Sequence, residues 1–410
     1  MSSVPGECGW PRQQDFATER PENQGGALSK APFLKFGGLK PQLLVFTSWF
    51  SFRSNCTIGQ GLVHEKESWN VILDFPERTD GGPARIDMHV HMVGNGQAGS
   101  GGWLRLSGWH RRLAGFMLRQ LGMSGSALEG DLETLYAELL LRLVRESSLD
   151  AVVLLAHERV HDPDGTPRED LGSMFVPNDV VLGLAKKHRE FLAGVSIHPA
   201  RTDALDELER CVAAGAVLMK CLPNCQNIDF ADRRYRRFWE RMAEARLPLL
   251  AHTGGEHTVP IINAALADPK LSRFPLECGV TVIAAHCGTS SGVFDRDYFE
   301  DWAMMLREFP NLYGDISAMV SLNRCRHLLD CLRDEIAPRI VHGSDFPVPV
   351  IGHRLRWQRT LARHTFRRIQ KLQNPLERDW QFKEALGFTN EIATRVSGLL
   401  RLDLVGDRTL

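Results

Sequence analysis

The sequence predicts an α/β protein built as a (β/α)8 TIM barrel, and two observations predict it. Eight short apolar segments recur between residues 84 and 347, most of them followed by turn residues and a longer amphipathic segment. Histidine, lysine or aspartate stands at or near the C-terminal end of each apolar segment. Strands that alternate with helices pair in parallel, and eight such units close into a barrel. Barrel enzymes gather their catalytic groups at the C-terminal ends of the strands.

Residues 1–80 precede the predicted barrel. They mix Pro, Gly, Ser, Gln and charged residues without sustained periodicity, so we expect a poorly ordered, largely irregular extension. Within it, PQLLVFTSWFSF (41–52) could pack locally, but it is too short to span a bilayer and too far inward for a signal peptide. Residues 84–410 are then expected to form one domain, the barrel together with C-terminal helices.

Each apolar segment is interpreted as one strand of the barrel. The segments are ARIDMHVHM (84–92), DAVVLLAHE (150–158), FLAGVSIHP (191–199), AVLMKCLP (216–223), PLLAHTG (248–254), VTVIAAHCG (280–288), LYGDISAM (312–319) and RIVHGSDFP (339–347). Apolar periodicity predicts helices near 204–215, 232–246, 258–269 and 296–309 between strands. Two further helical segments are predicted near 353–373 and 376–401, after the last strand.

The overall composition excludes several classes of partner. Hydrophobic residues make up 43% of the chain and charged residues 24%, which is ordinary for a globular protein. A formal net charge of −1 provides no field for nucleic acid or an anionic membrane, so neither is an expected partner. The nine cysteines include no C-x-x-C, which indicates free thiols and a cytoplasmic location. Cys221 and Cys225 lie close together, but no second pair completes a thiolate zinc site.

A glycine motif follows the first predicted strand. Gly94, Gly96 and Gly99 match the G-x-G-x-x-G of dinucleotide-binding folds. That site needs a helix to begin there and an acidic residue about 20 positions later; instead more glycine follows, and residues 112–122 contain no acid. Because this connection between the first two strands is unusually long, we interpret it as a mobile lid over the site.

The segment HERVH (157–161) matches the zinc-protease motif H-E-x-x-H. In that motif His157 and His161 would lie one helical turn apart on a metal, and Glu158 would act as a base. The turn sequence DPDG follows immediately and would end any helix. A zinc metalloprotease is therefore an alternative that this sequence does not favour, since it also leaves the other strand-end histidines unexplained.

The polar residues at the strand ends form a distributed set. On the first strand, alternation places Asp87, His89 and His91 on one face and the apolar residues between them toward the helices. Further along the chain, the set continues with Lys220, His252, His286 and Asp345. Imidazole and carboxylate ligands together suit zinc best, with manganese, iron or cobalt as other first-row options.

These residues, in this order, resemble the amidohydrolase superfamily of metal-dependent hydrolases, and the resemblance covers about residues 84–350. It rests on D-x-H-x-H in the first strand, histidines ending the fifth and sixth, and G-S-D in the eighth. The match is closest to the amidohydrolase-related branch, which includes the aminocarboxymuconate-semialdehyde decarboxylase type, and KCLPNCQNID and AHTGGEH look like an uncharacterised metal-dependent hydrolase subgroup of that branch. The resemblance implies that His89, His91 and Asp345 bind a divalent metal.

The resemblance also implies roles for the other strand-end residues. His252 would join the metal ligands in mononuclear members, and Asp345 would shuttle a proton to and from the attacking water. His286 would polarise the substrate or, in binuclear members, bind a second metal. Lys220 stands where doubly metallated members carry a carbamylated lysine, so one or two metals are both open. An unmodified Lys220 would instead bind a substrate carboxylate.

The remaining polar residues near the strand ends are candidates for contacting substrate. They are Glu256, His257, Arg324, His157 and His198. For His157 and His198 the alternative is a structural, hydrogen-bonded histidine, and for Arg324 it is an ordinary surface salt bridge. Asp315 could accept a hydrogen bond that fixes the tautomer of a ligand, or could cap the next turn. His342 alternates out of register with Asp345 and is expected to pack toward the helices or support the site.

We interpret the protein as a hydrolase of an ester, lactone or amide-like bond in a small molecule. A divalent ion lowers the pKa of bound water to about 7 and polarises a carbonyl, and a neighbouring carboxylate can carry the proton. The alternative in the same fold is a metal-dependent, non-oxidative decarboxylase. A third interpretation is an inactive barrel that serves as a binding module. The oligomeric state is open, with a homodimer as one option, and no motif identifies the substrate.

Overall fold

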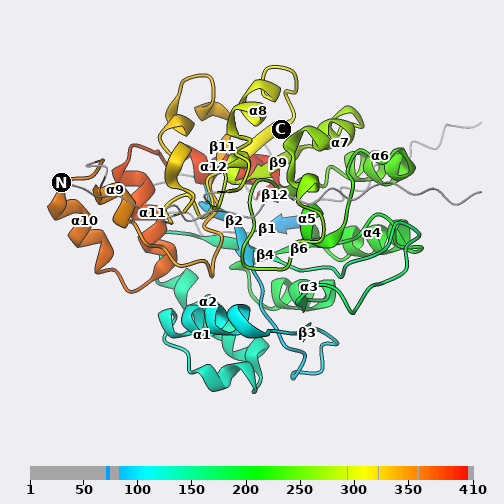
Figure 1. The fold of residues 1–410 in the computed structure, drawn as a ribbon, viewed down its shortest axis with the longest axis horizontal. Helices are drawn as coiled ribbons and strands as arrows, with labels where there is room; N and C mark the ends of the chain where they lie inside the picture. The colour runs from blue at the N-terminus through cyan, green and yellow to red at the C-terminus, as the bar shows by residue number, and fades with distance from the viewer. Residues whose placement is uncertain (1–70, 74–82, 293, 322, 358–359, 405–410) are drawn as a thin grey trace, which may run out of the picture. The chain divides into compact units, whose positions relative to one another are not determined.

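A computed structural model describes residues 71–73, 83–292, 294–321, 323–357 and 360–404. Eight parallel strands form one sheet with helices around it (Figure 1), in the order β2-β4-β6-β7-β8-β9-β10-β11. The strands are β2 (Ile86–His91), β4 (Ala151–Leu155), β6 (Phe191–Val195), β7 (Ala216–Cys221), β8 (Leu249–His252), β9 (Val282–Ala285), β10 (Leu312–Asp315) and β11 (Ile340–Val341). Each lies within one of the eight predicted segments, so the strand prediction is confirmed.

The sheet closes where its last strand meets its first. The Met88 amide donates to the His342 carbonyl at 3.2 Å, and the Asp345 amide donates to the His89 carbonyl at 2.8 Å. A parallel bridge between Val90 and Phe346 continues this contact beyond β11. Closure removes both edges of the sheet, and the predicted (β/α)8 barrel is confirmed.

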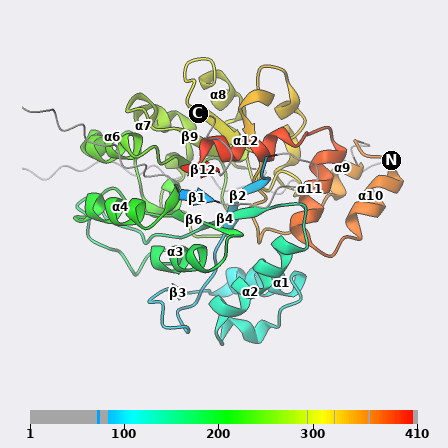
Figure 2. The same cartoon turned by 180° about the vertical axis from the view of Figure 1, so that it is seen from behind.

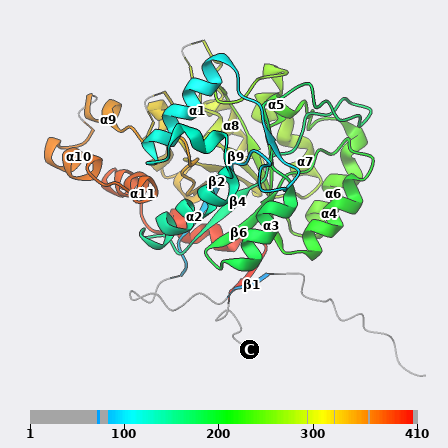
Figure 3. The ribbon, with the colours of Figure 1, turned by 90° about the horizontal axis from the view of Figure 1, so that it is seen from below.

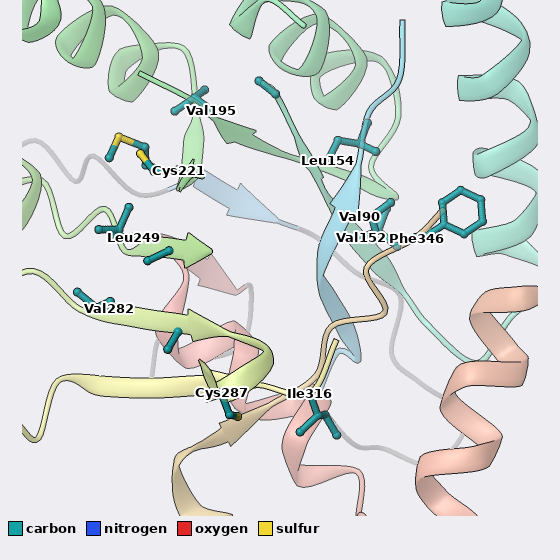
Figure 4. Close-up of a cluster of buried hydrophobic side chains, with 14 of the residues drawn as sticks. Val90, Val152, Leu154, Val195, Cys221, Leu249, Val282, Cys287, Ile316 and Phe346 are labelled. Atoms are coloured by element: carbon teal, nitrogen blue, oxygen red, sulfur yellow. The ribbon is translucent and has the colours of Figure 1, made fainter. Parts of the chain in front are cut away.

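Alternation along the strands divides the core into two layers. Val152 and Leu154 of β4 pack outward with Val195, Leu249 and other side chains against the helices (Figure 4). The intervening residues form a second buried cluster inside the barrel, which contains Met88, Val153, Leu155, Leu192, Leu218, Leu250 and Ile283. Because strand residues alternate between the two layers, the polar residues that follow the interior positions face the mouth of the barrel.

The first strand departs from simple alternation. A register shift between Asp87 and Val90 interrupts the pairing of β2 with β4, and Met88 joins the barrel interior. The Asp87 carboxylate accepts from the Ser344 and His89 amides and lies 3.8 Å from the His342 ring. The prediction that Asp87 shares a face with His89 and His91 is therefore wrong, because a bulge turns consecutive residues out of step.

Several predicted helices are confirmed between the strands. They are α4 (Ala204–Ala213), α6 (Arg236–Glu244) and α8 (Phe299–Met305). Helices that the sequence analysis did not specify are α2 (Leu132–Arg145), α3 (Asn178–Lys187), α5 (Pro223–Gln226) and α7 (Arg273–Glu277). The start of α2 follows local chemistry, since the Asp131 side chain accepts from the Thr134 amide at 3.0 Å and caps the first turn.

The helix predicted at 258–269 is wrong. The chain forms a loop there, followed by the 3-10 turns η3 (Ala264–Ala267) and η4 (Pro269–Ser272). The Glu256 carboxylate accepts from the amides of His257 and Thr258 at 2.8 and 2.5 Å. A side chain that binds these amides competes with helical hydrogen bonding, and Pro260 and Pro269 lack the amide that a helix interior needs.

The two C-terminal helical segments are each divided. The first contains α9 (His353–Trp357) and α10 (Arg363–Gln370), and the second contains α11 (Pro375–Ala385) and α12 (Glu391–Leu399). Gly387 ends α11 in the left-handed region at φ 104°, as glycine does at helix C-termini. The last helix, α12, lies against β2 and β11 (Figure 2), and its Val396 joins the cluster inside the barrel.

The predicted extension, residues 1–80, is described only at 71–73. These residues form β1 (Val71–Leu73), which pairs in parallel with β12 (Leu402–Leu404), so this short piece is not irregular. The remaining residues of the extension, including 41–52, lie outside the described residues. No helix in the described part of the chain has the length and apolar character needed to cross a bilayer.

The long connection between β2 and β4 carries its own elements. The glycine motif lies in a loop, and β3 (Trp103–Leu104) follows it and pairs with β5 (Met174–Phe175). Helix α1 (Gly108–Gln120) comes next and lies at the end of the barrel opposite β1 (Figure 3). No helix begins at the motif, which agrees with its exclusion as a dinucleotide site.

Candidate metal centre

Two histidines and one aspartate meet at the mouth of the barrel. His89 and His91 end β2, and Asp345 follows β11. The Nε2 atoms of the two rings are 3.2 Å apart, and Asp345 Oδ1 lies 3.2 Å from each of them. Together they form a group of side chains able to hold a metal ion, as the sequence predicted.

The spacing of these atoms fits a small divalent cation. Ligand atoms about 2.0–2.1 Å from a tetrahedral zinc lie roughly 3.3 Å from one another, close to the 3.2 Å found for all three pairs. Nε2 of His252 is buried and has no hydrogen-bond partner among the described residues, as expected of an atom reserved for a ligand. The residues therefore fit one ion of this kind, and the donor set alone does not identify the metal.

Asp315 orients the first histidine. Its Oδ2 lies 2.7 Å from Nδ1 of His89, so the proton on Nδ1 is donated to the carboxylate and Nε2 faces the cluster. Its Oδ1 accepts from the amides of His286 and Ser317 at 2.7 and 3.1 Å. Asp315 thus has both of the roles that the sequence left open: it accepts a hydrogen bond from the candidate ligand His89, and it caps the turn that follows its own strand.

His286 faces the same centre from β9. Its Nδ1 lies 2.8 Å from the carbonyl oxygen of Ser317, which leaves Nε2 directed inward, 3.9 Å from Asp345 Oδ2. The rings of His286 and His252 meet edge to face, with centroids 5.2 Å apart. His286 therefore lies close enough to Asp345 and His252 to touch a molecule bound at the cluster.

The backbone at these strand ends is strained. His286, Ala318 and Asp345 have φ values of 59°, 54° and 64°, in the left-handed region that non-glycine residues rarely adopt. Such residues cost about 1 kcal/mol or more each and persist where the surroundings hold them. The conformation of Asp345 turns its carboxylate back toward β2, where it meets the two histidines.

Lys220 lies against the cluster from β7. Its side chain is fully buried, and its Nζ lies 3.0 Å from Nε2 of His89. Burial lowers its pKa to about 8, because the interior disfavours the charged ammonium. The lysine therefore lies beside His89 near the end of β7.

The electrostatics of the cluster favour the ligand forms of its residues. Burial works to raise the pKa of Asp345, yet His89, His91 and Lys220 hold that pKa well below its usual range. Burial lowers the pKa of His252 to about 4 and holds that of His286 well below its usual value. A carboxylate and neutral imidazoles are the states that bind a divalent cation.

Two of the candidate substrate residues adjoin the cluster. Glu256 Oε2 lies 3.6 Å from Nε2 of His252, and Glu256 and His157 both line the cavity above the cluster. Nδ1 of His157 is buried and has no hydrogen-bond partner among the described residues. Burial lowers the pKa of His157 to about 3, so its ring is neutral and can exchange a hydrogen bond with a bound molecule.

The other candidate residues do not line the cavity above the cluster, although, after burial, the charge of Arg324 is the next cause that lowers the pKa of His286. His257 pairs with Asp295 at 2.9 Å and has a side chain that is 54% exposed. Arg324 is buried and donates to the carbonyls of Gly255 and Thr289, and it does not line the cavity. His198 is buried, 3.0 Å from the Gln226 carbonyl. These three side chains have structural partners where the structure places them.

His342 has a packing role, and the HERVH segment is not helical. His342 packs edge to face on Trp380 of α11 with centroids 5.2 Å apart, as expected from its register. Residues 157–161 are extended, with isolated bridges at His157 and His161. The helix that a zinc protease would require is therefore absent from HERVH, and this alternative is wrong.

Sequence analysis missed some residues of the site. The hydroxyl of Tyr136 in α2 donates to the His91 carbonyl at 2.9 Å, and Ser317 Oγ lies 2.9 Å from Nδ1 of both His89 and His286. Tyr136 is part of an apolar helical pattern, which gives no functional signal. Ser317 follows the Asp315 strand end by two residues, and that position was the one available signal.

Fold and cluster together define a barrel protein with a candidate metal centre at the ends of its strands. A sequence profile of the amidohydrolase family matches residues 86–366, which is more than half of the chain. The protein belongs to this family of enzymes, as the sequence resemblance indicated. A search of curated proteins found no match.

Solved structures are similar to this chain at low identity. An uncharacterised TIM-barrel protein from Bordetella bronchiseptica is 17% identical, with 74% of this chain and 97% of that chain covered and a TM-score of 0.48. A candidate 2-pyrone-4,6-dicarboxylic acid hydrolase from Pseudomonas putida is 16% identical, covering 78% and 97%, with a TM-score of 0.46. A 2,6-dihydroxybenzoate decarboxylase from Rhizobium is 15% identical, covering 77% and 100%, with a TM-score of 0.41.

Proposed function

We propose that the protein is a metal-dependent hydrolase of an ester, lactone or amide-like bond in a small molecule. The observation that carries this proposal is the group of three ligand atoms, each 3.2 Å from the other two, at the mouth of the barrel. A divalent ion held there would lower the pKa of a water molecule and polarise a carbonyl. Zinc is the metal we expect first, because the candidate ligands are imidazoles and a carboxylate.

The residues of the chain divide the work in this proposal. His89, His91 and Asp345 hold the ion, and His252 supplies a further nitrogen. Asp345 accepts the proton of the attacking water at a carboxylate oxygen and returns it to the leaving group. His286 gives its Nδ1 proton to the Ser317 carbonyl, so its Nε2, 3.9 Å from Asp345, accepts a hydrogen bond from the substrate or binds a second ion. Glu256 and His157 contact the substrate in the cavity.

Lys220 bears on the number of metals. Its Nζ lies 3.0 Å from Nε2 of His89, so a carbamate formed on it would add carboxylate-type oxygens beside the proposed ligands, and two ions would then be the expected content. An unmodified Lys220 leaves one ion as the expected content. A homodimer and a cytoplasmic location stay predictions.

The proposal is tested on the full-length protein by metal content and turnover. We expect His89→Ala to lose bound metal and Asp345→Asn to lose about 10²–10⁴-fold in turnover of an ester or lactone. Asp297→Asn is the matched control, because Asp297 pairs with His327 at 3.2 Å outside the cavity lining. Full metal content and full activity in both site variants would reject the proposal. CO2 release from aromatic acids without hydrolysis would establish the decarboxylase alternative instead.

A further inference from the structure

An apolar cavity lies directly above the candidate metal centre. Its volume is about 140 Å³, and its floor is formed by His91, His252, His286 and Asp345. The roof comes from α1, whose inner face contributes Leu113, Met117 and Leu118 among others. A cavity of about 150 Å³ lined by Leu, Ile and Phe binds benzene in an engineered protein. The space above the cluster thus suits one aromatic ring or a short alkyl chain.

The described residues that line the cavity include no lysine or arginine side chain, and the one imidazole among them on the roof is His110 of α1. Lys220 is fully buried beside His89, and Arg324 is directed to the carbonyls of Gly255 and Thr289. The acidic residues of the lining are Glu256 and Asp345, and both lie beside the cluster. A substrate carboxylate placed under α1 would therefore meet no lysine or arginine of this described lining to compensate its desolvation.

The polar groups of the walls suit an uncharged partner. His157 presents a buried Nδ1 that has no hydrogen-bond partner among the described residues. Thr258 lines the same cavity, with its hydroxyl directed to Glu256. A neutral imidazole can exchange one hydrogen bond with a carbonyl or hydroxyl group, whereas it does not neutralise an anion.

We propose that the molecule bound here is uncharged away from its reacting group and places an aromatic ring or short alkyl chain under α1. This inference rests on the proposed function for the reacting end, which lies at the metal centre. It adds a substrate class, because it excludes dicarboxylates and other compounds that carry a second, distal carboxylate. Selectivity then comes from the apolar inner face of α1.

A pair of ketones tests the proposal without turnover. Acetophenone and 4-acetylbenzoate share the carbonyl group and the ring, and differ by a carboxylate at the far end. Binding to the metal-loaded, full-length protein is measured by calorimetry or ligand-observed NMR. We expect acetophenone to bind at least about tenfold more tightly, since an unpaired buried carboxylate is costly. Because ketones are not hydrolysed, the difference in affinity between the two compounds can be measured even if the protein proves not to be a hydrolase.

Two adjacent residues of α1 provide matched variants. Met117 lines the cavity, and Phe116 is on the exposed side of the helix at 39%. We expect Met117→Arg to reverse the preference by pairing with the distal carboxylate, and Phe116→Arg to leave it unchanged. Leu113→Lys replaces Met117→Arg if that variant does not fold. Equal or tighter binding of 4-acetylbenzoate by the unaltered protein, binding of neither ketone, or an unchanged preference in both inner-face variants would overturn the proposal.

Discussion

The floor and the roof of the cavity are built in different ways. At the floor, Asp315 bonds Nδ1 of His89 and the His286 amide at 2.7 Å, and Ser317 Oγ lies 2.9 Å from Nδ1 of both histidines. At the roof, α1 contributes apolar side chains to the cavity, and its charged side chains lie on the outer face, as in the exposed pair of Arg111 with Glu129 at 3.1 Å. Side chains at the strand ends are held in fixed positions, as catalytic and metal-binding groups need to be. Side chains of the long connection between β2 and β4 are better placed to select which molecule binds.

This difference predicts how each region tolerates change. A side chain in the barrel interior is enclosed by neighbouring strands, so its loss leaves a cavity. A side chain of the roof already borders a cavity, and its loss enlarges a space that exists. The floor should therefore determine stability and metal binding, and the roof should determine which molecules bind.

The largest effect is expected from a substitution inside the barrel. Leu250 is fully buried in the interior cluster, so Leu250→Ala should lower the free energy of unfolding by about 2–5 kcal/mol. Met117→Ala, at the roof, should lower it by about 1 kcal/mol or less. Urea unfolding of both variants checks the contrast. Equal losses in the two variants would show that α1 belongs to the same packed core as the barrel.

A smaller effect is expected where the floor holds its ligands. Asp315→Asn removes the negative charge behind Nδ1 of His89, and changes at such positions lower metal affinity by about 10–100-fold. Competition with a chromophoric chelator measures this change. Asp297→Asn, which alters a similar pair with His327, should leave metal affinity unchanged. An Asp315→Asn protein with normal affinity would show that Asp315 only caps the turn through the amides of His286 and Ser317.

The barrel was predictable because its signal repeats. Eight apolar segments that each end in a polar residue define both the strands and the end where the site lies, so errors in one segment do not change the fold. The same reasoning placed His89, His91 and Asp345 together from strand ends more than 250 residues apart in the sequence. Their meeting follows from closure of the sheet, which brings β11 beside β2.

Local irregularities were not predictable in the same way. The bulge in β2 separates Asp87 from the two histidines, and alternation alone cannot show where a strand gains an extra residue. The loop after β8 replaces a predicted helix because Glu256 binds the amides that follow it. Whether Arg324 reaches a substrate depended on which carbonyls lie near its side chain, and that is decided by loops without periodicity.

The smallest effect on stability is expected where α2, in the connection between β2 and β4, contacts the floor of the cavity. Tyr136 of α2 lines the cavity and donates its hydroxyl to the His91 carbonyl at 2.9 Å, so Tyr136→Phe leaves that oxygen without this donor. Losing one such hydrogen bond costs about 1 kcal/mol of unfolding free energy, and urea unfolding measures it. Tyr235→Phe is a control, because the Tyr235 hydroxyl forms no hydrogen bond within the described part of the chain. A large loss of bound metal in Tyr136→Phe would mean that α2 positions His91, and the division between floor and roof would have to move to include that helix.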